Sequence, residues 1–213
     1  MTAWIKWFEL AAALAAIINW RRVSSNKFIK LLALLLMFIT AVEFVGYAIK
    51  FYKRYNTQFY NFLIEPGIFI LYATAFYNGF LEKNNKKIAI KGSIVVLIIY
   101  GLTLFTVDTN KFLNIPGYTG GALFISLLAI LKLIEIIKTD DPDFFKRPLV
   151  YLLLTIMFYY MTTIPHFAVA YYFYIHKIKN NATVFLASIN IIFNYALYFS
   201  YMITFFLWDR KTQ

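Results

Sequence analysis

The sequence of 213 residues contains no cysteine, which excludes disulfide bonds, thiolate metal sites and a cysteine nucleophile. It has neither a glycine-rich nucleotide-binding motif nor the Gly-x-Ser-x-Gly motif of serine hydrolases. Its two histidines, His166 and His176, stand ten residues apart, which is not the spacing of a metal-binding pair on one helix. We therefore expect no metal site and no cofactor.

Charged residues are also scarce, at 15% of the chain, whereas soluble domains carry about 25%. Hydrophobic residues make up 62% and aromatic residues 21%. So much apolar surface must face lipid instead of water. At about 20 residues per transmembrane helix, the chain has room for seven and for no separate soluble domain. We therefore expect an all-α polytopic membrane bundle that forms one domain over residues 1–213.

Seven apolar runs, separated by charged or turn-forming residues, predict seven transmembrane helices. No stretch alternates with a period of two, so strands are not expected. The first run is expected to be a retained helix and not a signal peptide, since no small-residue cleavage site follows it. A loop with Pro and Gly turn signals is expected at residues 111–121. The seven runs cover residues 4–20, 28–51, 62–81, 88–107, a fifth segment that ends near 137, 148–172 and 183–208.

The distribution of lysine and arginine predicts the orientation in the membrane. With the N-terminus outside, thirteen of these cations fall at the cytoplasmic ends and seven at the outer ends, while Lys132 lies within the fifth run. The positive-inside rule therefore favours an outer N-terminus and a cytoplasmic C-terminus. The cytoplasmic set is Arg21, Arg22, Lys27, Lys30, Lys83, Lys86, Lys87, Lys91, Lys138, Lys146, Arg147, Arg210 and Lys211. The outer set is Lys6, Lys50, Lys53, Arg54, Lys111, Lys177 and Lys179.

Ionisable side chains within hydrocarbon are costly, so each one is a candidate functional residue. Glu43 lies far from both ends of the second run, and Thr40, Glu43 and Tyr47 share one helix face. Two interpretations of Glu43 stay open: it belongs to a functional site, or it only supports packing between helices.

Polar stripes on the sixth and seventh runs indicate faces that point into the bundle. The stripe on the sixth run consists of Tyr151, Thr155, Tyr159, Thr162 and His166, and that on the seventh of Asn190, Asn194, Tyr198 and Tyr201. With the predicted topology, these stripes bring polar groups to the outer half of the membrane, where Glu9, Glu43 and Glu65 also lie.

These residues together predict a pocket that opens outward and is closed toward the cytoplasm. Its lining would be acidic or proton-sharing, so it suits a small cationic or hydrogen-bonding ligand, or a proton. The inner half has few polar residues, chiefly Lys132 and Glu135, whose spacing predicts a local ion pair. The candidate ligand-binding residues are Thr40, Glu43, Tyr47, Asn61, Glu65, Tyr159, Thr162, His166, Asn190 and Asn194.

Three segments carry a resemblance to a known family. They are residues 41–46 (Ala-Val-Glu-Phe-Val-Gly), residues 60–66 (Tyr-Asn-Phe-Leu-Ile-Glu-Pro), and the last two runs with Pro148, Asn190 and Asn194. The chain resembles a bacterial family of small seven-helix membrane proteins that look like sensor modules working beside signalling kinases. The resemblance implies location in the bacterial inner membrane and gives Glu43, Asn61 and Glu65 additional weight. It implies no chemistry.

The leading hypothesis is a receptor-like membrane sensor, with residues 139–147 as a docking loop for a cytoplasmic signalling protein. A small-solute or proton-coupled transporter is the alternative, and would need a second access route from the cytoplasm. A lipid-acting enzyme would use Glu43 and His166 as acid and base. A structural partner subunit is a further option, and the apolar helix surface could support a homodimer. The net charge of +11 lies mostly at helix ends, so no nucleic-acid binding is expected.

Overall fold

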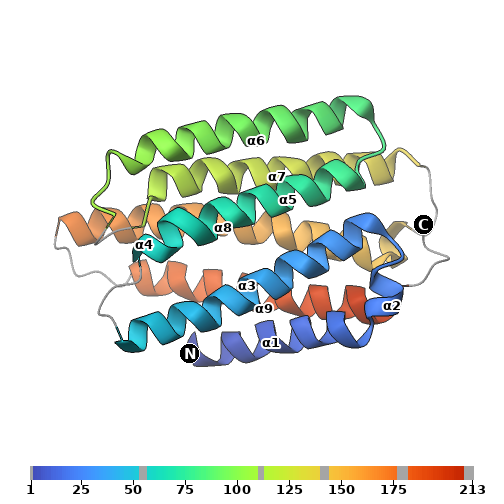
Figure 1. Ribbon diagram of the computed structural model, residues 1–213, viewed down its shortest axis with the longest axis horizontal. Coiled ribbons are helices and arrows are strands. Elements are labelled where there is room, and N and C mark those ends of the chain that lie inside the picture. Colours follow the sequence, from blue (N-terminus) through green and yellow to red (C-terminus); the bar gives the residue numbers. More distant parts are fainter. Residues whose placement is uncertain (1, 53–56, 110–112, 140–143, 177–181, 209–213) are drawn as a thin grey trace.

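The computed structural model describes all residues except 1, 53–56, 110–112, 140–143, 177–181 and 209–213. The described residues form long helices that run up and down beside one another, and they contain no strand (Figure 1). Six of these helices are long and apolar enough to cross a membrane, which indicates an integral membrane protein. The six segments are Lys27–Gly46, Thr57–Gly79, Lys83–Leu104, Ile115–Ile137, Pro148–Phe173 and Val184–Leu207.

Helix bounds follow the predicted runs closely. The described elements are α1 (Thr2–Ile18), α2 (Trp20–Val23), α3 (Lys27–Tyr52), α4 (Thr57–Phe59), the π-helical turn η1 (Tyr60–Ile64), α5 (Glu65–Gly79), α6 (Lys83–Leu104), α7 (Ile115–Ile137), η2 (Phe144–Lys146), α8 (Pro148–Ile175) and α9 (Ala182–Leu207). The seventh predicted run corresponds to α9 and the first to α1, which has 17 residues and is not among the six.

The loop predicted at residues 111–121 is shorter than expected, because its turn signals mark the start of a helix. The side chain of Asn114 accepts a hydrogen bond from the backbone N–H of Gly117 and caps α7, which begins at Ile115. Pro116 is tolerated there, since the N–H groups of a first helical turn have no partner within the helix.

Six helices form a closed ring, and one lies outside it. Contacts join α1 to α3, α3 to α5, α5 to α7, α7 to α8, α8 to α9 and α9 back to α1. Helix α6 packs only on the outer side of this ring, against α5 and α7, as its place at the edge of Figure 1 shows. The ring therefore surrounds an interior to which α6 does not contribute.

Two glycines of the bundle allow helices to approach closely. The ring of Phe69 on α5 lies against Gly121 of α7, and the ring of Phe124 on α7 lies against Gly92 of α6. A Cβ atom at either glycine would overlap the facing ring. These contacts fix how α5, α6 and α7 pack together.

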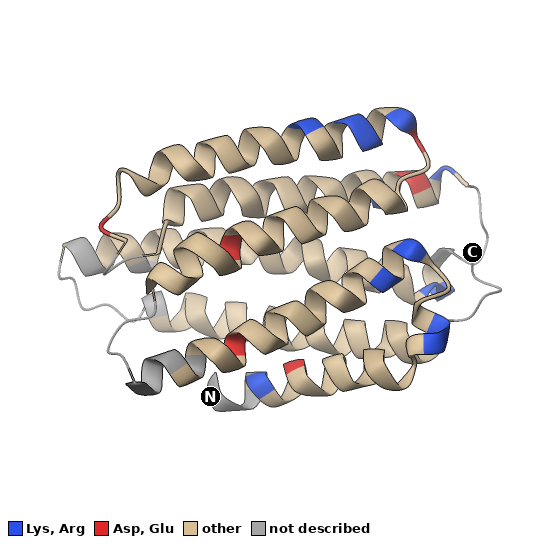
Figure 2. Ribbon diagram, in the orientation of Figure 1, with Lys and Arg blue, Asp and Glu red and all other residues tan. Residues whose placement is uncertain are grey.

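Described charges separate along the bundle axis (Figure 2). Most described lysines and arginines gather at the end where α1 finishes and α3 begins, which we call the basic end. The opposite end, where α1 begins, is called the N-terminal end. Glu43 falls in the second half of α3 and Glu65 begins α5, so both lie in that half of the bundle, and Glu9 lines the same cavity as they do. Five cations predicted for that side (Lys53, Arg54, Lys111, Lys177 and Lys179) lie outside the described residues.

Candidate functional site

A cavity of about 270 Å³ lies between the ring helices, in the half of the bundle toward the N-terminal end. Every ring helix contributes to its lining. The lining residues are Ile5, Lys6 and Glu9 of α1; Leu36, Ile39 and Glu43 of α3; Tyr60 and Ile64 of η1; Glu65, Ile68 and Tyr72 of α5; Leu113; Tyr118 of α7; Tyr159, Tyr160 and Phe167 of α8; and Asn194, Leu197, Tyr198 and Tyr201 of α9.

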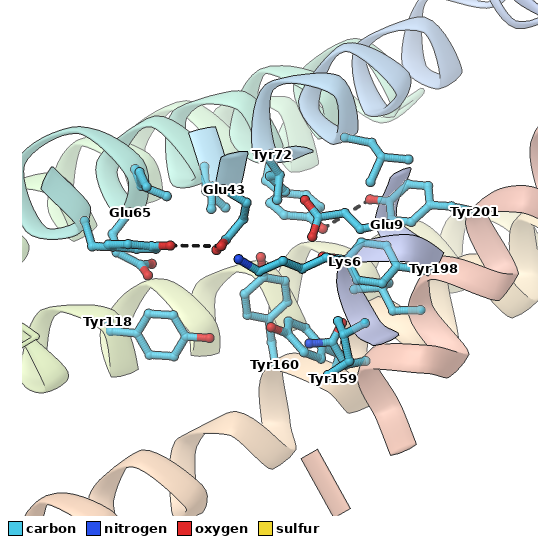
Figure 3. Close-up of a pocket in the computed structure, with 18 of the residues that line it drawn as sticks. Lys6, Glu9, Glu43, Glu65, Tyr72, Tyr118, Tyr159, Tyr160, Tyr198 and Tyr201 are labelled. Atoms are coloured by element: carbon cyan, nitrogen blue, oxygen red, sulfur yellow. Dashed lines mark hydrogen bonds between the residues drawn. The ribbon is translucent and has the colours of Figure 1, made fainter. Parts of the chain in front are cut away.

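Three carboxylates reach this cavity from three different helices. Figure 3 shows Glu9, Glu43 and Glu65 directed into the same space, with Lys6 among them. The lining therefore contains three acidic groups and one basic group. A carboxylate in an apolar environment is costly unless cations or hydrogen-bond donors compensate it. The lining thus favours a positively charged or donor-rich occupant.

The π-helical turn brings two of the polar groups onto one face. Residues five apart approach one another in a π turn, because its hydrogen bonds join residue i to i+5. Tyr60 and Glu65 therefore both line the cavity, on either side of a turn that precedes Pro66. The hydroxyl of Tyr60 donates a hydrogen bond of 2.9 Å to Oε2 of Glu43 (Figure 3). This contact joins η1 to α3 across the cavity wall.

Two oxygen atoms of the lining residues lack a donor. Oε1 of Glu9 and Oδ1 of Asn194 are buried and have no hydrogen-bond partner among the described atoms. Buried polar atoms without a partner are rare in folded proteins, and each one needs an explanation. Both atoms are acceptors, and both residues line the cavity. An occupant that donates hydrogen bonds would satisfy them.

Tyrosines form much of the remaining wall. The hydroxyls of Tyr72 and Tyr201 share a hydrogen bond of 3.2 Å across the interior. The hydroxyl of Tyr118 donates to Oγ1 of Thr163 at 3.1 Å. Tyr160 packs edge-on against Tyr72 with ring centroids 5.5 Å apart. Aromatic faces attract cations, so this wall suits the same class of occupant as the carboxylates.

Four of the predicted site residues line the cavity: Glu43, Glu65, Tyr159 and Asn194. Five others have described side chains but are not among its lining residues: Thr40, Asn61, Thr162, His166 and Asn190. The backbone of Tyr47 belongs to α3, but its side chain lies outside what the structure describes.

Asn61 has a structural environment that the sequence did not reveal. It is fully buried, and its Oδ1 accepts a hydrogen bond of 2.8 Å from the backbone N–H of Asn114. Its carbonyl accepts one of 2.9 Å from the hydroxyl of Tyr100. Asn114 in turn donates from Nδ2 to the carbonyl of Tyr100 at 2.9 Å. These bonds tie η1 to the α6–α7 connection, behind the cavity wall.

The polar stripe predicted along the sixth run only partly faces the interior. Tyr151 is 51% exposed, whereas Tyr160 and Thr163 are buried, so the buried face lies beside the stripe. The hydroxyl of Thr162 bonds to the carbonyls of Phe158 and Tyr159 in its own helix. A threonine satisfied in this way needs no partner on another helix. For this reason the polar stripe is a poor guide to which face of α8 is buried.

Nδ1 of His166 and Oδ1 of Asn190 are buried without a described hydrogen-bond partner. The His166 ring packs on Phe167, with centroids 5.2 Å apart, and Phe167 lines the cavity. Thr40 is buried and bonds to the carbonyl of Leu36. Thr40, His166 and Asn190 therefore lie on helices that line the cavity, but they are not lining residues themselves.

Five polar lining residues are not among the predicted pocket residues: Lys6, Tyr60, Tyr72, Tyr118 and Tyr160. A signal existed for Lys6, because it stands three residues before Glu9 on a helix and so shares its face. The tyrosines gave little signal, since tyrosine is also common at membrane interfaces.

No group of His, Asp or Glu residues in the described part of the chain is placed to hold a metal ion. No family model, curated protein or solved structure matches this chain.

Proposed function

We propose that this chain is a seven-span receptor-like membrane protein that binds a small organic cation in the cavity between its ring helices. The observation that carries the proposal is the combination of Glu9, Glu43 and Glu65 with the unsatisfied acceptors Glu9 Oε1 and Asn194 Oδ1 in one lining. An ammonium or guanidinium group supplies both the positive charge and the donors that this lining needs.

The wall and the size of the cavity support the same class of ligand. A tyrosine ring stabilises a cation by about 0.5–1 kcal/mol at an exposed site and by about 2 kcal/mol when water is excluded. A volume of about 270 Å³ is at the small end of ligand pockets and suits a molecule with few non-hydrogen atoms. The proposed ligand is therefore a small protonated amine, quaternary ammonium ion or guanidine.

The proposed topology treats α1 as the seventh span. Its 17 residues extend about 26 Å, close to the thickness of the hydrocarbon layer. It packs along α3 and α9 within the ring, and both of these helices are long and apolar enough to cross a membrane. The cations at the basic end support a cytoplasmic location for that end, so that the cavity lies nearer the outside. The proposed membrane is the bacterial inner membrane.

Buried apolar side chains between the cavity and the basic end favour a receptor over a transporter. Fully buried side chains, including Leu32, Phe76 and Ile125, fill the interior there. A second cavity, of about 630 Å³, at the basic end supports a transporter as the second candidate. Among the described residues, its lining holds Lys27, Lys132 and Arg147 with the acid Glu135, so it lacks the group of three carboxylates that would attract a cation. Uptake of a labelled ligand by proteoliposomes distinguishes the two functions.

A lipid-acting enzyme that pairs Glu43 with His166 gains no support from the geometry, because His166 is not part of the lining that contains Glu43. The proposed output of the receptor runs through a cytoplasmic signalling protein that docks at residues 139–147, of which residues 140–143 lie outside the described part of the chain.

A thermal-stability screen of the purified protein tests the proposal. The ligands are choline, small primary amines and guanidines, each paired with a neutral analogue of the same shape, such as dimethylbutanol for choline. We expect at least one cation to raise the melting temperature while its neutral analogue does not. The proposal fails if neutral analogues stabilise the protein as well as the cations do, or if no cation stabilises it.

A further inference from the structure

A basic residue, Lys6 of α1, points into the acidic cavity between the ring helices. Among the described lining residues, it is the basic group that stands against Glu9, Glu43 and Glu65. Figure 3 shows its side chain directed toward Glu43, with the ammonium nitrogen in the space that the three carboxylates face. Lys6 is half-buried in this position. The cavity therefore already holds an ammonium group, which the chain itself supplies.

The charges of the lining hold this ammonium group in the cavity. Lys6 and Glu9 stand three residues apart on α1, so they share a helix face, and their opposite charges attract each other. Glu43 repels both Glu9 and Glu65 when these carboxylates are ionised. A cation among the three lowers their electrostatic energy. Lys6 thus plays, without a ligand, the part that we propose for the charge of the ligand.

The ammonium group of Lys6 does not complete the site. Glu9 is only 4% exposed, and its Oε1 lacks a donor among the described atoms, as does Oδ1 of Asn194. Both atoms accept hydrogen bonds and both residues line the cavity. A ligand with its own ammonium group can therefore satisfy acceptors that the tethered one leaves open.

Lys6 can leave the cavity when a ligand enters. Helix α1 begins at Thr2, so the backbone of Lys6 lies about 6 Å from the start of the helix. A lysine side chain has a flexible four-carbon stem, and near a helix end it can extend its ammonium group to the membrane surface. The side chain can thus turn from the cavity toward water without movement of the helix.

We infer that the Lys6 ammonium group occupies the cation site in the ligand-free protein, and that a ligand displaces it in order to bind. Lys6 is then a built-in competitor that lowers the apparent affinity for the ligand. This inference rests on the proposed cation site and adds a means of regulating it.

The test uses the purified full chain and a probe that reproduces the lysine side chain. Lys6→Ala removes the propylammonium part of the side chain, and free n-propylammonium contains the same atoms. Lys6→Met removes the charge but keeps a side chain of similar length. The matched control is Lys30→Ala, since Lys30 is exposed and does not line the cavity. Melting temperatures are recorded while each protein is titrated with n-propylammonium chloride or with 1-propanol at constant ionic strength.

We expect the n-propylammonium concentration for a half-maximal shift to fall roughly tenfold in Lys6→Ala, because the probe no longer competes with a tethered charge for the same partners. Lys30→Ala should respond like the wild type. Lys6→Met should fall between the wild type and Lys6→Ala, since its stem still fills part of the space. Lys6→Met therefore keeps the comparison with the wild type available if Lys6→Ala does not fold.

The half-maximal concentration is compared instead of the melting temperature, so a variant that is merely less stable does not imitate the effect. The inference is overturned if neither substitution of Lys6 lowers this concentration, or if 1-propanol acts as well as n-propylammonium. Equal responses of Lys6→Ala and Lys6→Met would also overturn it, because Lys6 would then act through its charge at a distance and not by occupying the site.

Failure of the proposed function gives a different pattern. If a cation stabilises the wild type and the Lys6 variants respond no better, the cation site stands and only the inference about Lys6 fails. If n-propylammonium stabilises Lys6→Ala while no cation stabilises the wild type, Lys6 fills the site permanently. That result would support the place of Lys6 in the site and contradict the proposed receptor.

Discussion

The hydroxyl of Tyr60 stands 2.9 Å from Oε2 of Glu43 and donates a hydrogen bond to it, which links the π-helical turn to the middle of α3. Glu43 is the intramembrane acid that the sequence singles out, and Tyr60 is the partner that only the fold supplies. We expect Tyr60→Phe to lower the free energy of unfolding by about 1 kcal/mol, since one hydrogen bond is lost and the ring remains. Reversible unfolding in mixed detergent measures this change.

Tyr77→Phe is the matched control for Tyr60→Phe. Tyr77 is 40% exposed, and Lys86 is the cation near its ring, at 6.0 Å from the centroid. Its substitution should leave the stability almost unchanged. Equal effects of the two substitutions would show that the contact between Tyr60 and Glu43 does not stabilise the protein.

Glu135→Gln should destabilise the protein far more, by about 3–5 kcal/mol, because it leaves the buried Lys132 without its counter-charge. Adding Lys132→Met should recover part of this loss, since the uncompensated charge is then removed as well. The measurement is the free energy of unfolding of the single and double variants.

Glu82→Gln provides the comparison for the buried pair. Glu82 pairs with Lys138 at 2.8 Å, but both side chains are exposed, so we expect a change below about 1 kcal/mol. A Glu135→Gln variant as stable as Glu82→Gln would contradict the structural role assigned to Glu135.

Two adjacent glycines of α7 should respond in opposite ways to alanine. A Cβ on Gly121 would overlap the buried ring of Phe69, so Gly121→Ala should cost about 1–3 kcal/mol. A Cβ on Gly120 would meet no atom within 4 Å, so Gly120→Ala should gain about 0.5–1 kcal/mol from helix propensity. The melting temperatures of the two variants test the packing of α5 on α7. Equal shifts in Gly121→Ala and Gly120→Ala would contradict this packing.

The proposed seven-span topology is accessible to single-cysteine labelling, because the chain contains no cysteine. Thr2→Cys and Thr57→Cys should react with a membrane-impermeant maleimide in intact cells, and Ser25→Cys only after the cells are opened. If α1 does not cross the membrane, the cysteines at residues 2 and 25 will label from the same side.

Much of this architecture could be predicted from the sequence because hydrocarbon permits few structures. Apolar runs of sufficient length predict helices, and a carboxylate within such a run predicts an interior position, as Glu43 and Glu65 illustrate. Asn194, Tyr198 and Tyr201 were also predictable, since their stripe on α9 faces the cavity at helical spacing. The local ion pair between Lys132 and Glu135 is confirmed at 3.2 Å.

Other features depend on backbone detail that periodicity does not carry. The π turn changes which residues share a helix face between Tyr60 and Glu65, and no residue pattern in the sequence predicts this turn. Asn61 and Thr162 look like site residues because they are polar, yet hydrogen bonds to nearby backbone satisfy them. The cavity at the basic end joins residues from helix ends that are far apart in the sequence, so only the assembled bundle reveals it.

The most direct test of the central claim is calorimetric titration of the purified protein with the most stabilising cation and with its neutral analogue. The titration is repeated for Glu9→Gln, Glu43→Gln and the control Glu82→Gln. We expect the wild type and the control to bind the cation, and the two cavity variants to bind it at least about tenfold more weakly, since each loses a charged partner. Equal affinity in all four proteins, or equal binding of the neutral analogue, would show that the acidic cavity is not a cation site.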